Sequence, residues 1–255
     1  MVPDRVSNPQ LPLAVGGGTI RAYETRDRQA VREICCRTAY RNRGTDTVFE
    51  DTALIADYWT AYYTDYEPES ALVVEENGQV VGYLFGCCDT NRHIRLMATR
   101  ILPPLLFKLL LRLVTGRYRK RQTYRMIKWW ATASWREAPP IPLDRYPAHY
   151  HCNILREGLG KRYYSTMAMI FVDRIEALGI PGLHGAVEEA ASGGPWTRMV
   201  AGVNRPDLIE YRADRPSTLL RDVLGEPKSV VNRVWGARID TYRLFLSIVA
   251  SKYGI

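Results

Sequence analysis

The sequence lacks a long uninterrupted apolar run, which limits how the chain can meet a membrane. Its most apolar stretch, residues 101–114, is 14 residues long and is interrupted by Lys108 and Arg112. A membrane-spanning helix needs about 20 apolar residues, so this stretch is excluded as one. It is typical instead of an amphipathic helix that packs on a core, which we favour, or of one that lies in a membrane interface.

The sequence also lacks the cysteine spacing of a metal site or a disulfide framework. Its five cysteines stand as two adjacent pairs and one single residue, Cys35-Cys36, Cys87-Cys88 and Cys152. Neighbouring cysteines rarely bridge each other, the number is odd, and no C-x-x-C spacing occurs, so we expect no metal ligands here. Free thiols are typical of a reducing compartment, and the first residues lack the order of a signal peptide. We therefore expect a cytoplasmic protein.

Acidic residues are absent between Asp89 and Glu137, and this absence localises the excess of positive charge. The chain has 35 basic and 27 acidic residues, a net charge of +8 that favours nucleic acid or an anionic membrane as partner. Twelve basic residues lie in the acid-free segment, so the remainder carries a net charge of −4. Binding of nucleic acid or a membrane surface through residues 92–136 is one hypothesis, although no nucleic-acid motif accompanies the charge. The twelve are Arg92, Arg95, Arg100, Lys108, Arg112, Arg117, Arg119, Lys120, Arg121, Arg125, Lys128 and Arg136.

The composition is otherwise that of an ordinary globular chain. Apolar residues make up 46% of the 255 and charged residues 24%, which excludes a disordered chain and permits a substantial core. A strand–loop–helix–strand unit in the second half predicts a mixed, partly parallel α/β sheet. Periodicity and turn signals predict strands at 19–23, 71–74, 80–88, 149–155, 183–187, 207–211 and 230–239. They predict helices at 26–41, 162–178 and 241–252, with partial helical spacing at 54–66 and a helical basic segment. An irregular segment is expected after the strand at 183–187, where Gly193-Gly194-Pro195 breaks the chain.

Three stretches resemble the GNAT acyltransferase superfamily. Residues 67–90 (EPESALVVEENGQVVGYLFGCCDT) are similar to the family's second and third strands. Residues 146–161 (YPAHYHCNILREGLGK) resemble its fourth strand and the start of its cofactor loop, and residues 180–188 (IPGLHGAVE) resemble its fifth strand. The resemblance implies a GNAT-like α/β (α+β) fold, in which helices flank a mixed central sheet.

The resemblance also implies a domain organisation and an activity. A flexible tail at 1–18 precedes one domain at 19–255, with a basic helical insertion at 90–147 between the third and fourth strands and a divergent part at 190–255. GNAT enzymes move an acyl group from a CoA thioester, usually acetyl-CoA, to a small amine or similar nucleophile. The alternative is a pseudoenzyme, a repurposed enzyme or a binding module that has lost acetyl-CoA binding. We expect the insertion to cover the acceptor side of the cleft or to form a self-association surface, which makes a homodimer a second expectation.

A cofactor site of this kind has simple physical requirements. A pyrophosphate group needs several backbone N–H groups aimed at it, which a glycine-rich loop at a helix N-terminus supplies. An extended pantetheine arm pairs with an exposed strand edge. The strand at 149–155 and the loop and helix after it provide both features. The resemblance implies that the cofactor-binding residues are Asn153, Ile154, Leu155, Arg156, Leu159, Gly160, Lys161, Arg162, Tyr163 and Tyr164.

The cofactor loop departs from the family pattern Q/R-x-x-G-x-G/A. Without gaps, its six positions fall on residues 159–164, so Arg162 and Tyr164 replace the two small residues. A tyrosine there obstructs the approach of a phosphate group, which glycine would allow. A second register aligns the glycines with Gly158 and Gly160 and shortens the loop by four residues; we favour the gap-free register. The basic side chains of the loop could contact an anion instead of the backbone, or remain solvated.

Three residues are candidate catalytic groups. His149 and His151 alternate along one strand and share a face, so His151 is a candidate base if that face meets the cleft. A histidine satisfied within the core is the competing interpretation. Glu188 and Glu189 stand at the end of the fifth strand, beside the expected acyl group, where a merely solvated carboxylate is also common. The residues at 190–204 preserve no counterpart of the family's acid tyrosine.

Aromatic residues gather where the family builds its acceptor wall. Such a wall suits an apolar or ring-bearing small-molecule acceptor, although core packing explains most aromatic side chains equally well. The residues concerned are Trp59, Tyr62, Tyr63 and Tyr66.

Overall fold

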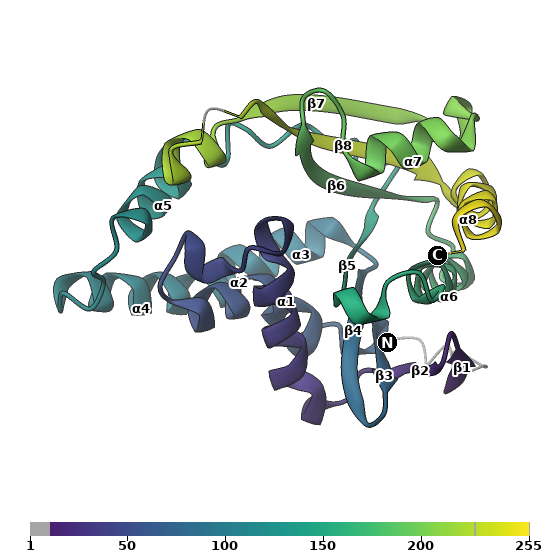
Figure 1. The fold of residues 1–255 in the computed structure, drawn as a ribbon, viewed down its shortest axis with the longest axis horizontal. Helices are drawn as coiled ribbons and strands as arrows, with labels where there is room; N and C mark the ends of the chain where they lie inside the picture. Colours follow the sequence, from purple (N-terminus) through teal and green to yellow (C-terminus); the bar gives the residue numbers. More distant parts are fainter. Residues whose placement is uncertain (1–10, 227, 255) are drawn as a thin grey trace.

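The computed structural model describes residues 11–226 and 228–254, and its central element is an eight-stranded sheet (Figure 1). The strands lie in the order β1-β2-β3-β4-β5-β6-β8-β7. Neighbours run antiparallel except β5 and β6, which run parallel. The predicted mixed, partly parallel sheet is therefore confirmed. The bounds are β1 Leu13–Val15, β2 Gly18–Ala22, β3 Ala71–Glu76, β4 Gln79–Cys87, β5 Ala148–Ile154, β6 Gly182–Ala190, β7 Tyr211–Ser217 and β8 Val230–Arg238.

The sheet divides between β5 and β6. Only Ala148 and His149 of β5 pair with β6, opposite Leu183 and His184. Beyond this point β6 pairs with β8 along its whole length. The strands β1–β5 and β6–β8 therefore form two halves that meet at one place and then diverge, with β6–β8 uppermost in Figure 1. This divergence positions the candidate site.

Helices cover both faces of the sheet. The helices α1 and α2 pack on one face of β4, whereas α6 packs on the other and is joined by α8 and α7. Each face has its own apolar core, with Phe49 and Phe85 in the first and Phe171 and Phe245 in the second. The bounds are α1 Arg28–Asn42, α2 Thr52–Asp65, α6 Tyr163–Ala177, α7 Pro195–Val203 and α8 Ile239–Tyr253.

The hairpin of β3 and β4 forms as its turn sequence predicts. Asn77 and Gly78 both have positive φ angles, 49° and 76°, as a two-residue type I′ turn requires. The helices predicted at 26–41, 162–178 and 241–252 are likewise present as α1, α6 and α8.

The basic insertion forms a helical arm. Helix α3 (Thr90–Leu96), a π-helical turn (Met97–Ile101) and α4 (Leu102–Val114) follow without interruption, and α5 (Arg121–Thr132) comes after them. Helix α4 packs against α2, and α5 packs against the π-helical turn η7 (Leu220–Leu224) between β7 and β8. The arm thus connects the two diverging halves of the sheet on the side of α1 and α2 (Figure 1).

Two predictions for the C-terminal part are wrong. The segment expected to be irregular contains α7, because Pro195 suits the first helical position and Glu189 accepts hydrogen bonds from the helix N-terminus. The strand expected at 207–211 lies at Tyr211–Ser217 instead. It is an edge strand with largely exposed side chains and a proline, Pro216, so it carries little apolar alternation.

The predicted tail at 1–18 differs in part from the structure. Residues 1–10 lie outside the described residues. Leu13–Val15 forms β1, which pairs with β2 and extends the sheet by one strand.

Candidate active site

An open strand edge lies where the two halves of the sheet diverge. Leu155 N donates to Val81 O on β4 at 2.9 Å, and successive residues of a strand alternate in the direction of their backbone groups. The N–H and C=O groups of Cys152 and Ile154 therefore face β6. Pairing between β5 and β6 ends at His149, so within the described ranges these groups have no partner strand. They are available to pair with an extended ligand.

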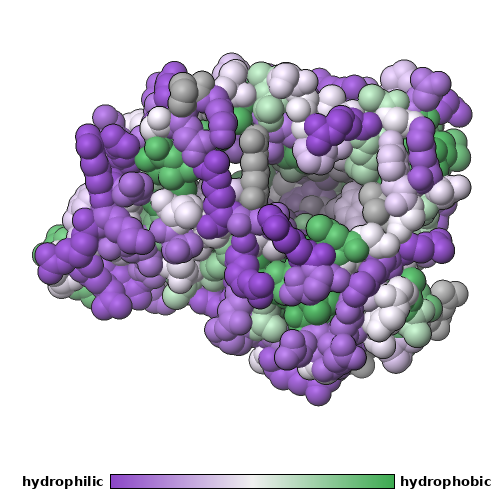
Figure 2. All heavy atoms as spheres, viewed as in Figure 1, coloured by the Kyte–Doolittle hydropathy of each residue, from purple (hydrophilic) through white to green (hydrophobic). Residues whose placement is uncertain are grey.

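Two cavities lie against this edge, one on each face of β5. Cys152 and Ile154 line a groove of 790 Å³ that also contacts α6 and α7, which we call the α6-side groove. His151 and Asn153 line a cavity of 690 Å³ that also contacts α1, α2 and α3, which we call the α1-side cavity. Figure 2 shows the molecule hollowed between its two halves. Two compartments therefore adjoin one strand edge.

The loop between β5 and α6 forms one wall of the α6-side groove. It contains the turn Arg156–Gly158, then Gly160 with φ 76° and Arg162 with φ 65°, and α6 begins at Tyr163. Arg162 thus has the left-handed conformation that favours glycine, at the position where the resemblance places the first small residue. A side chain in this conformation costs on the order of 1 kcal/mol.

Two of the predicted cofactor-binding residues have partners outside the groove. Lys161 Nζ lies 2.9 and 2.8 Å from the two carboxylate oxygens of Glu76, and the buried Tyr163 donates its hydroxyl to the same carboxylate at 2.7 Å. The hydrogen bond from Lys161, together with that from Tyr163, holds the pKa of Glu76 below its usual range. The charge of Lys161 is therefore already neutralised.

Two arginines supply the positive charge of the α6-side groove. Arg162 and Arg198 line it, and both are exposed. In the part of the chain that the structure describes, neither guanidinium group forms an ion pair. Arg156, in contrast, lines a separate cavity with Glu33. Arg162 and Arg198 are thus the groups that can bind an anion in this groove.

Tyr164 joins a buried cluster of tyrosine hydroxyls beside the groove. Its oxygen lies 2.7 Å from that of Tyr150 and 3.4 Å from that of Tyr242. Burial raises the pKa of all three phenols, so each stays protonated and serves as donor and acceptor to the others. The stacked rings of Trp196 and Trp235 continue this aromatic wall toward α7. Only Tyr164 and Trp196 of these side chains line the groove itself.

His151 is a fixed, neutral imidazole in the wall of the α1-side cavity. Asn153 Nδ2 lies 3.1 Å from His151 Nε2 and also donates to the Tyr83 hydroxyl at 2.7 Å. With the amide donating to Nε2, the ring proton is on Nδ1. Burial lowers the pKa of His151 to about 4, so the ring is uncharged at pH 7.

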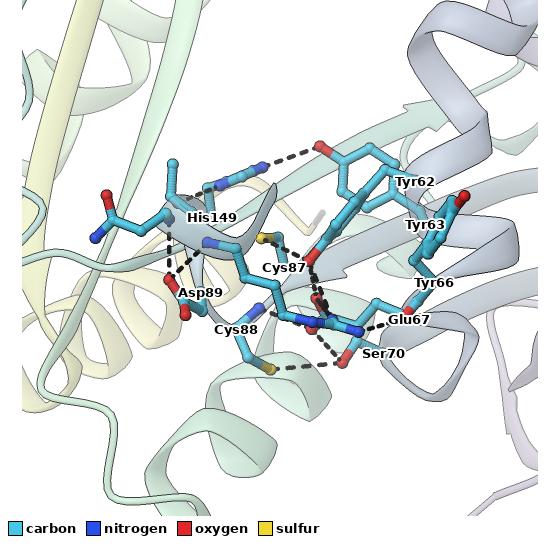
Figure 3. A network of polar contacts seen from close by, with 12 residues as sticks. Tyr62, Tyr63, Tyr66, Glu67, Ser70, Cys87, Cys88, Asp89 and His149 are labelled. Carbon is cyan, nitrogen blue, oxygen red and sulfur yellow. Dashed lines mark hydrogen bonds and ion pairs between the residues drawn. The ribbon is translucent and has the colours of Figure 1, made fainter. Parts of the chain in front are cut away.

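A second histidine lies behind this cavity in a directed chain of hydrogen bonds (Figure 3). Thr90 donates its hydroxyl to Pro147 O at 2.7 Å, so it accepts from His149 Nδ1, also at 2.7 Å. His149 Nε2 then accepts from the hydroxyl of Tyr63 at 2.9 Å. Burial lowers the pKa of His149 well below its usual value, which keeps the ring neutral. The chain fixes the orientation of Tyr63, which lines the cavity.

The same close-up shows how the insertion is anchored at its start (Figure 3). The buried Glu67 accepts hydrogen bonds from the Tyr62 hydroxyl at 2.7 Å and from Cys88 N at 2.8 Å. Arg92 of α3 lies 3.6 Å from this carboxylate and donates to Tyr66 O at 3.0 Å. These contacts tie α3 to the ends of α2 and β4, which places His93 of α3 in the cavity wall.

No protein-family model matches the chain, but solved structures do. The crystal structure of SsHAT matches with a TM-score of 0.55 and 23% sequence identity, over 88% of this chain and 98% of that chain. A structure of an N-acetyltransferase from Staphylococcus aureus Mu50 has a TM-score of 0.45 and 12% identity, over 87% and 98%. A GNAT superfamily phosphinothricin acetyltransferase from Sinorhizobium meliloti, in complex with AcCoA, has a TM-score of 0.45 and 14% identity, over 87% and 88%.

The chain has the GNAT fold. Identities this low establish the fold and carry no activity over to this chain. The predicted GNAT-like architecture is therefore confirmed, including the helical insertion between the predicted third and fourth strands. These two strands are β4 and β5 in the structure, because β1 adds one strand before them.

The GNAT fold separates the two acidic candidates at the end of β6. Glu188 lines the α1-side cavity and accepts from the Ser217 hydroxyl at 3.2 Å. Glu189 points to the opposite face, where it accepts from Trp196 N at 2.6 Å, from the Thr197 hydroxyl at 2.6 Å and from Arg233 at 3.0 Å. Glu189 is thus an N-terminal cap of α7. The structure brings only Glu188 together with His151.

Two of the four residues of the predicted aromatic wall line a cavity in this GNAT-fold chain. Trp59 and Tyr63 line the α1-side cavity, whereas Tyr62 packs beneath it. Tyr40 and Tyr58 also line this cavity, and the sequence did not predict that they would. Their signal was weak, because a tyrosine on a helix that covers a sheet packs on a core more often than it lines a site. Arg198 was missed for another reason, since α7 itself was not predicted.

Proposed function

We propose that this GNAT-fold protein transfers an acyl group from a CoA thioester, such as acetyl-CoA, to a small amine. The observation that carries the proposal is the open edge of β5 between two cavities. A thioester arm that binds in the α6-side groove pairs with this edge. Its acyl carbon then reaches a nucleophile in the α1-side cavity through the opening between the two halves of the sheet. Direct transfer needs this arrangement, because both reactants must meet at one carbon atom.

The chain's own residues offer a donor site of unusual composition. Cys152 and Ile154 present the backbone groups that an amide-containing arm can pair with, as a peptide does when it adds a strand. Arg162 and Arg198 supply guanidinium groups for phosphates, in place of the cradle that two small loop residues would form. When bound, the thioester supplies the activated acyl carbon.

The acceptor side fits a protonated amine on a ring-bearing or apolar body. Tyr40, Tyr58 and Trp59 provide aromatic faces and Glu188 provides a carboxylate, a combination that attracts an ammonium group. Glu188 then removes one proton from the ammonium group, the nitrogen bonds to the acyl carbon, and the carbon–sulfur bond breaks. The second proton that leaves the nitrogen protonates the departing thiolate, so the products are an amide and free CoA thiol. His151, with its proton on Nδ1, serves as a neutral hydrogen-bond donor in the same cavity.

Titration calorimetry with acetyl-CoA tests the donor site. Wild-type protein is expected to bind one equivalent, and either Arg162→Ala or Arg198→Ala is expected to weaken binding at least about tenfold, the worth of one hydrogen bond to a charged group. Arg212→Ala, an exposed arginine on β7 outside the groove, is the matched control and is expected to leave affinity unchanged. Absence of binding by the wild type at millimolar acetyl-CoA would overturn the proposal.

One observation favours a second candidate, a GNAT fold that has lost CoA binding. Tyr164 stands at the position of the second small residue, and its ring lines the groove while its hydroxyl is held by Tyr150. This candidate predicts that the wild type binds no acetyl-CoA and that Tyr164→Ala or Tyr164→Gly gains binding. The same titration therefore separates the two candidates.

A further inference from the structure

Helix α4 presents an apolar face that nothing in the described structure covers. Its side chains there are spaced as neighbours on one helical face, at positions i, i+3, i+4 and i+7. Phe107 is 69% exposed and Val114 is 81% exposed, values typical of a surface residue and unusual for large apolar side chains. The face consists of Leu106, Phe107, Leu110, Leu111 and Val114.

The opposite side of α4 accounts for its place in the fold. Leu105 and Leu109 are buried and belong to the core on the α1 and α2 face of the sheet. Arg112 pairs with Asp51, which precedes α2. Core packing therefore explains one side of α4 and leaves the exposed face without a role in folding, so the sequence prediction of a core-packing helix describes only half of this element.

The helical arm that carries the exposed face contains charged residues of one sign only. Residues 90–136 contain twelve basic residues and no acidic ones. Several of them are exposed and have no ion-pair partner among the described residues: Arg95, Arg100, Lys108, Arg117, Arg119 and Arg121. Figure 2 shows apolar atoms surfacing among hydrophilic ones at the left-hand end of the molecule, where Figure 1 places α4. Large apolar side chains beside cations are the composition of a membrane-interface helix.

We propose that α4 docks this protein on the surface of an anionic lipid bilayer. None of the described helices is both long and apolar enough to span a bilayer, so the helix lies in the interface, with its apolar face in the acyl boundary and the cations at the headgroups. The charge decides between this partner and a second copy of the chain. A symmetric contact through α4 would bring the same unpaired cations together from both copies, because the nearby carboxylates of Asp51 and Glu50 are already engaged by Arg112 and by backbone N–H groups of the arm. Anionic headgroups complement them.

Co-sedimentation of the full chain with lipid vesicles tests this proposal. The protein is expected to bind equimolar phosphatidylcholine–phosphatidylglycerol vesicles, to bind pure phosphatidylcholine vesicles at least about tenfold more weakly, and to lose affinity as salt rises. The double variant Leu110→Asp/Val114→Asp is expected to lose at least about tenfold in affinity, because both side chains leave the acyl boundary. Leu244→Asp, on α8 and 43% exposed, is the matched control and is expected to bind as the wild type does.

Two further measurements keep the result interpretable. Circular dichroism and thermal unfolding establish that each variant is folded, and Arg117→Gln/Arg119→Gln tests the cations without touching the apolar face. Loss of about fivefold or more in this second variant supports the proposal, since each cation near an anionic surface contributes a few-fold in affinity. Equal binding by wild type and both double variants overturns it. So does concentration-dependent dimerisation, abolished by Leu110→Asp/Val114→Asp, in a protein that does not bind vesicles.

Discussion

Lowering the pH from 7 to 4 is expected to destabilise the folded protein by several kcal/mol. Burial lowers the pKa of His93 and His151 from 6.5 to about 4, and it lowers those of His149 and His184 as well. These four are all the histidines of the chain, and they lie on β5, β6 and α3 where the two halves of the sheet diverge. The unfolded chain takes up protons on these rings near pH 6.5, whereas in the folded chain His93 and His151 take them up only near pH 4.

The sign and size follow from this difference in proton uptake. The stability that depends on the neutral rings is present in full above pH 6.5 and is lost as the pH falls toward 4. A pKa lowered from 6.5 to about 4 corresponds to a loss of about 3 kcal/mol for each of His93 and His151. Total stabilities of domains are about 5–15 kcal/mol, so an acid-unfolding transition within this window is the expected result.

Urea unfolding at half-unit intervals of pH measures this effect. His151→Gln keeps a neutral polar side chain and is expected to remove about 3 kcal/mol of the pH dependence, while its stability at pH 7.5 stays close to that of the wild type. A free energy of unfolding that is flat from pH 6.5 to pH 4.5 in the wild type would contradict the account.

Glu188→Gln and Glu189→Gln are expected to have opposite consequences, although the residues are neighbours in the chain. Glu188→Gln removes the proposed base from the α1-side cavity, so kcat is expected to fall about 100-fold or more, within the range for general base catalysis. Its stability and its affinity for acetyl-CoA are expected to stay unchanged. Glu189→Gln weakens a buried cap of α7 and its ion pair with Arg233, so it is expected to cost about 2–3 kcal/mol of stability with little change in kcat.

Release of free thiol from acetyl-CoA, with tyramine and other ring-bearing primary amines as acceptors, measures kcat for this pair. Thermal unfolding of the same samples measures stability. If Glu188→Gln retains full kcat, or if Glu189→Gln is the variant that loses kcat while staying as stable as the wild type, the assignment of the two carboxylates is wrong. Because neighbouring side chains of β6 point to opposite faces of the sheet, each variant is the matched control for the other.

The elements predicted well from the sequence are those with strong local signals. Asn77-Gly78 fixes the β3–β4 hairpin because few other residues adopt both positive φ angles. The strand at 149–155 and the helix after it were found from their apolar periodicity, and they place His151 and Asn153 in a cavity wall. Edge strand β7 had no such signal, because its exposed residues do not alternate in polarity.

The parts of the site that the sequence did not reveal depend on tertiary contacts. Glu188 and Glu189 look equivalent in the sequence, and only the pairing of β6 with β8 decides which one faces the cavity. Lys161 looks available to a phosphate, but the turn at the end of β3 brings Glu76 to it. Arg198 could not be assigned to the groove without α7, whose cap is Glu189, seven residues before Trp196.

Residue-resolved hydrogen exchange of β5, with and without saturating acetyl-CoA, tests the central claim most directly. The claim is that an acyl-CoA pairs with the open edge of β5 between the two halves of the sheet. The amides of Cys152 and Ile154 face that edge, whereas those of His151 and Asn153 already bond to β4. Exchange at Cys152 and Ile154 is predicted to slow at least about tenfold on binding, with little change at the other two. Unchanged exchange along β5 at millimolar acetyl-CoA would contradict the account.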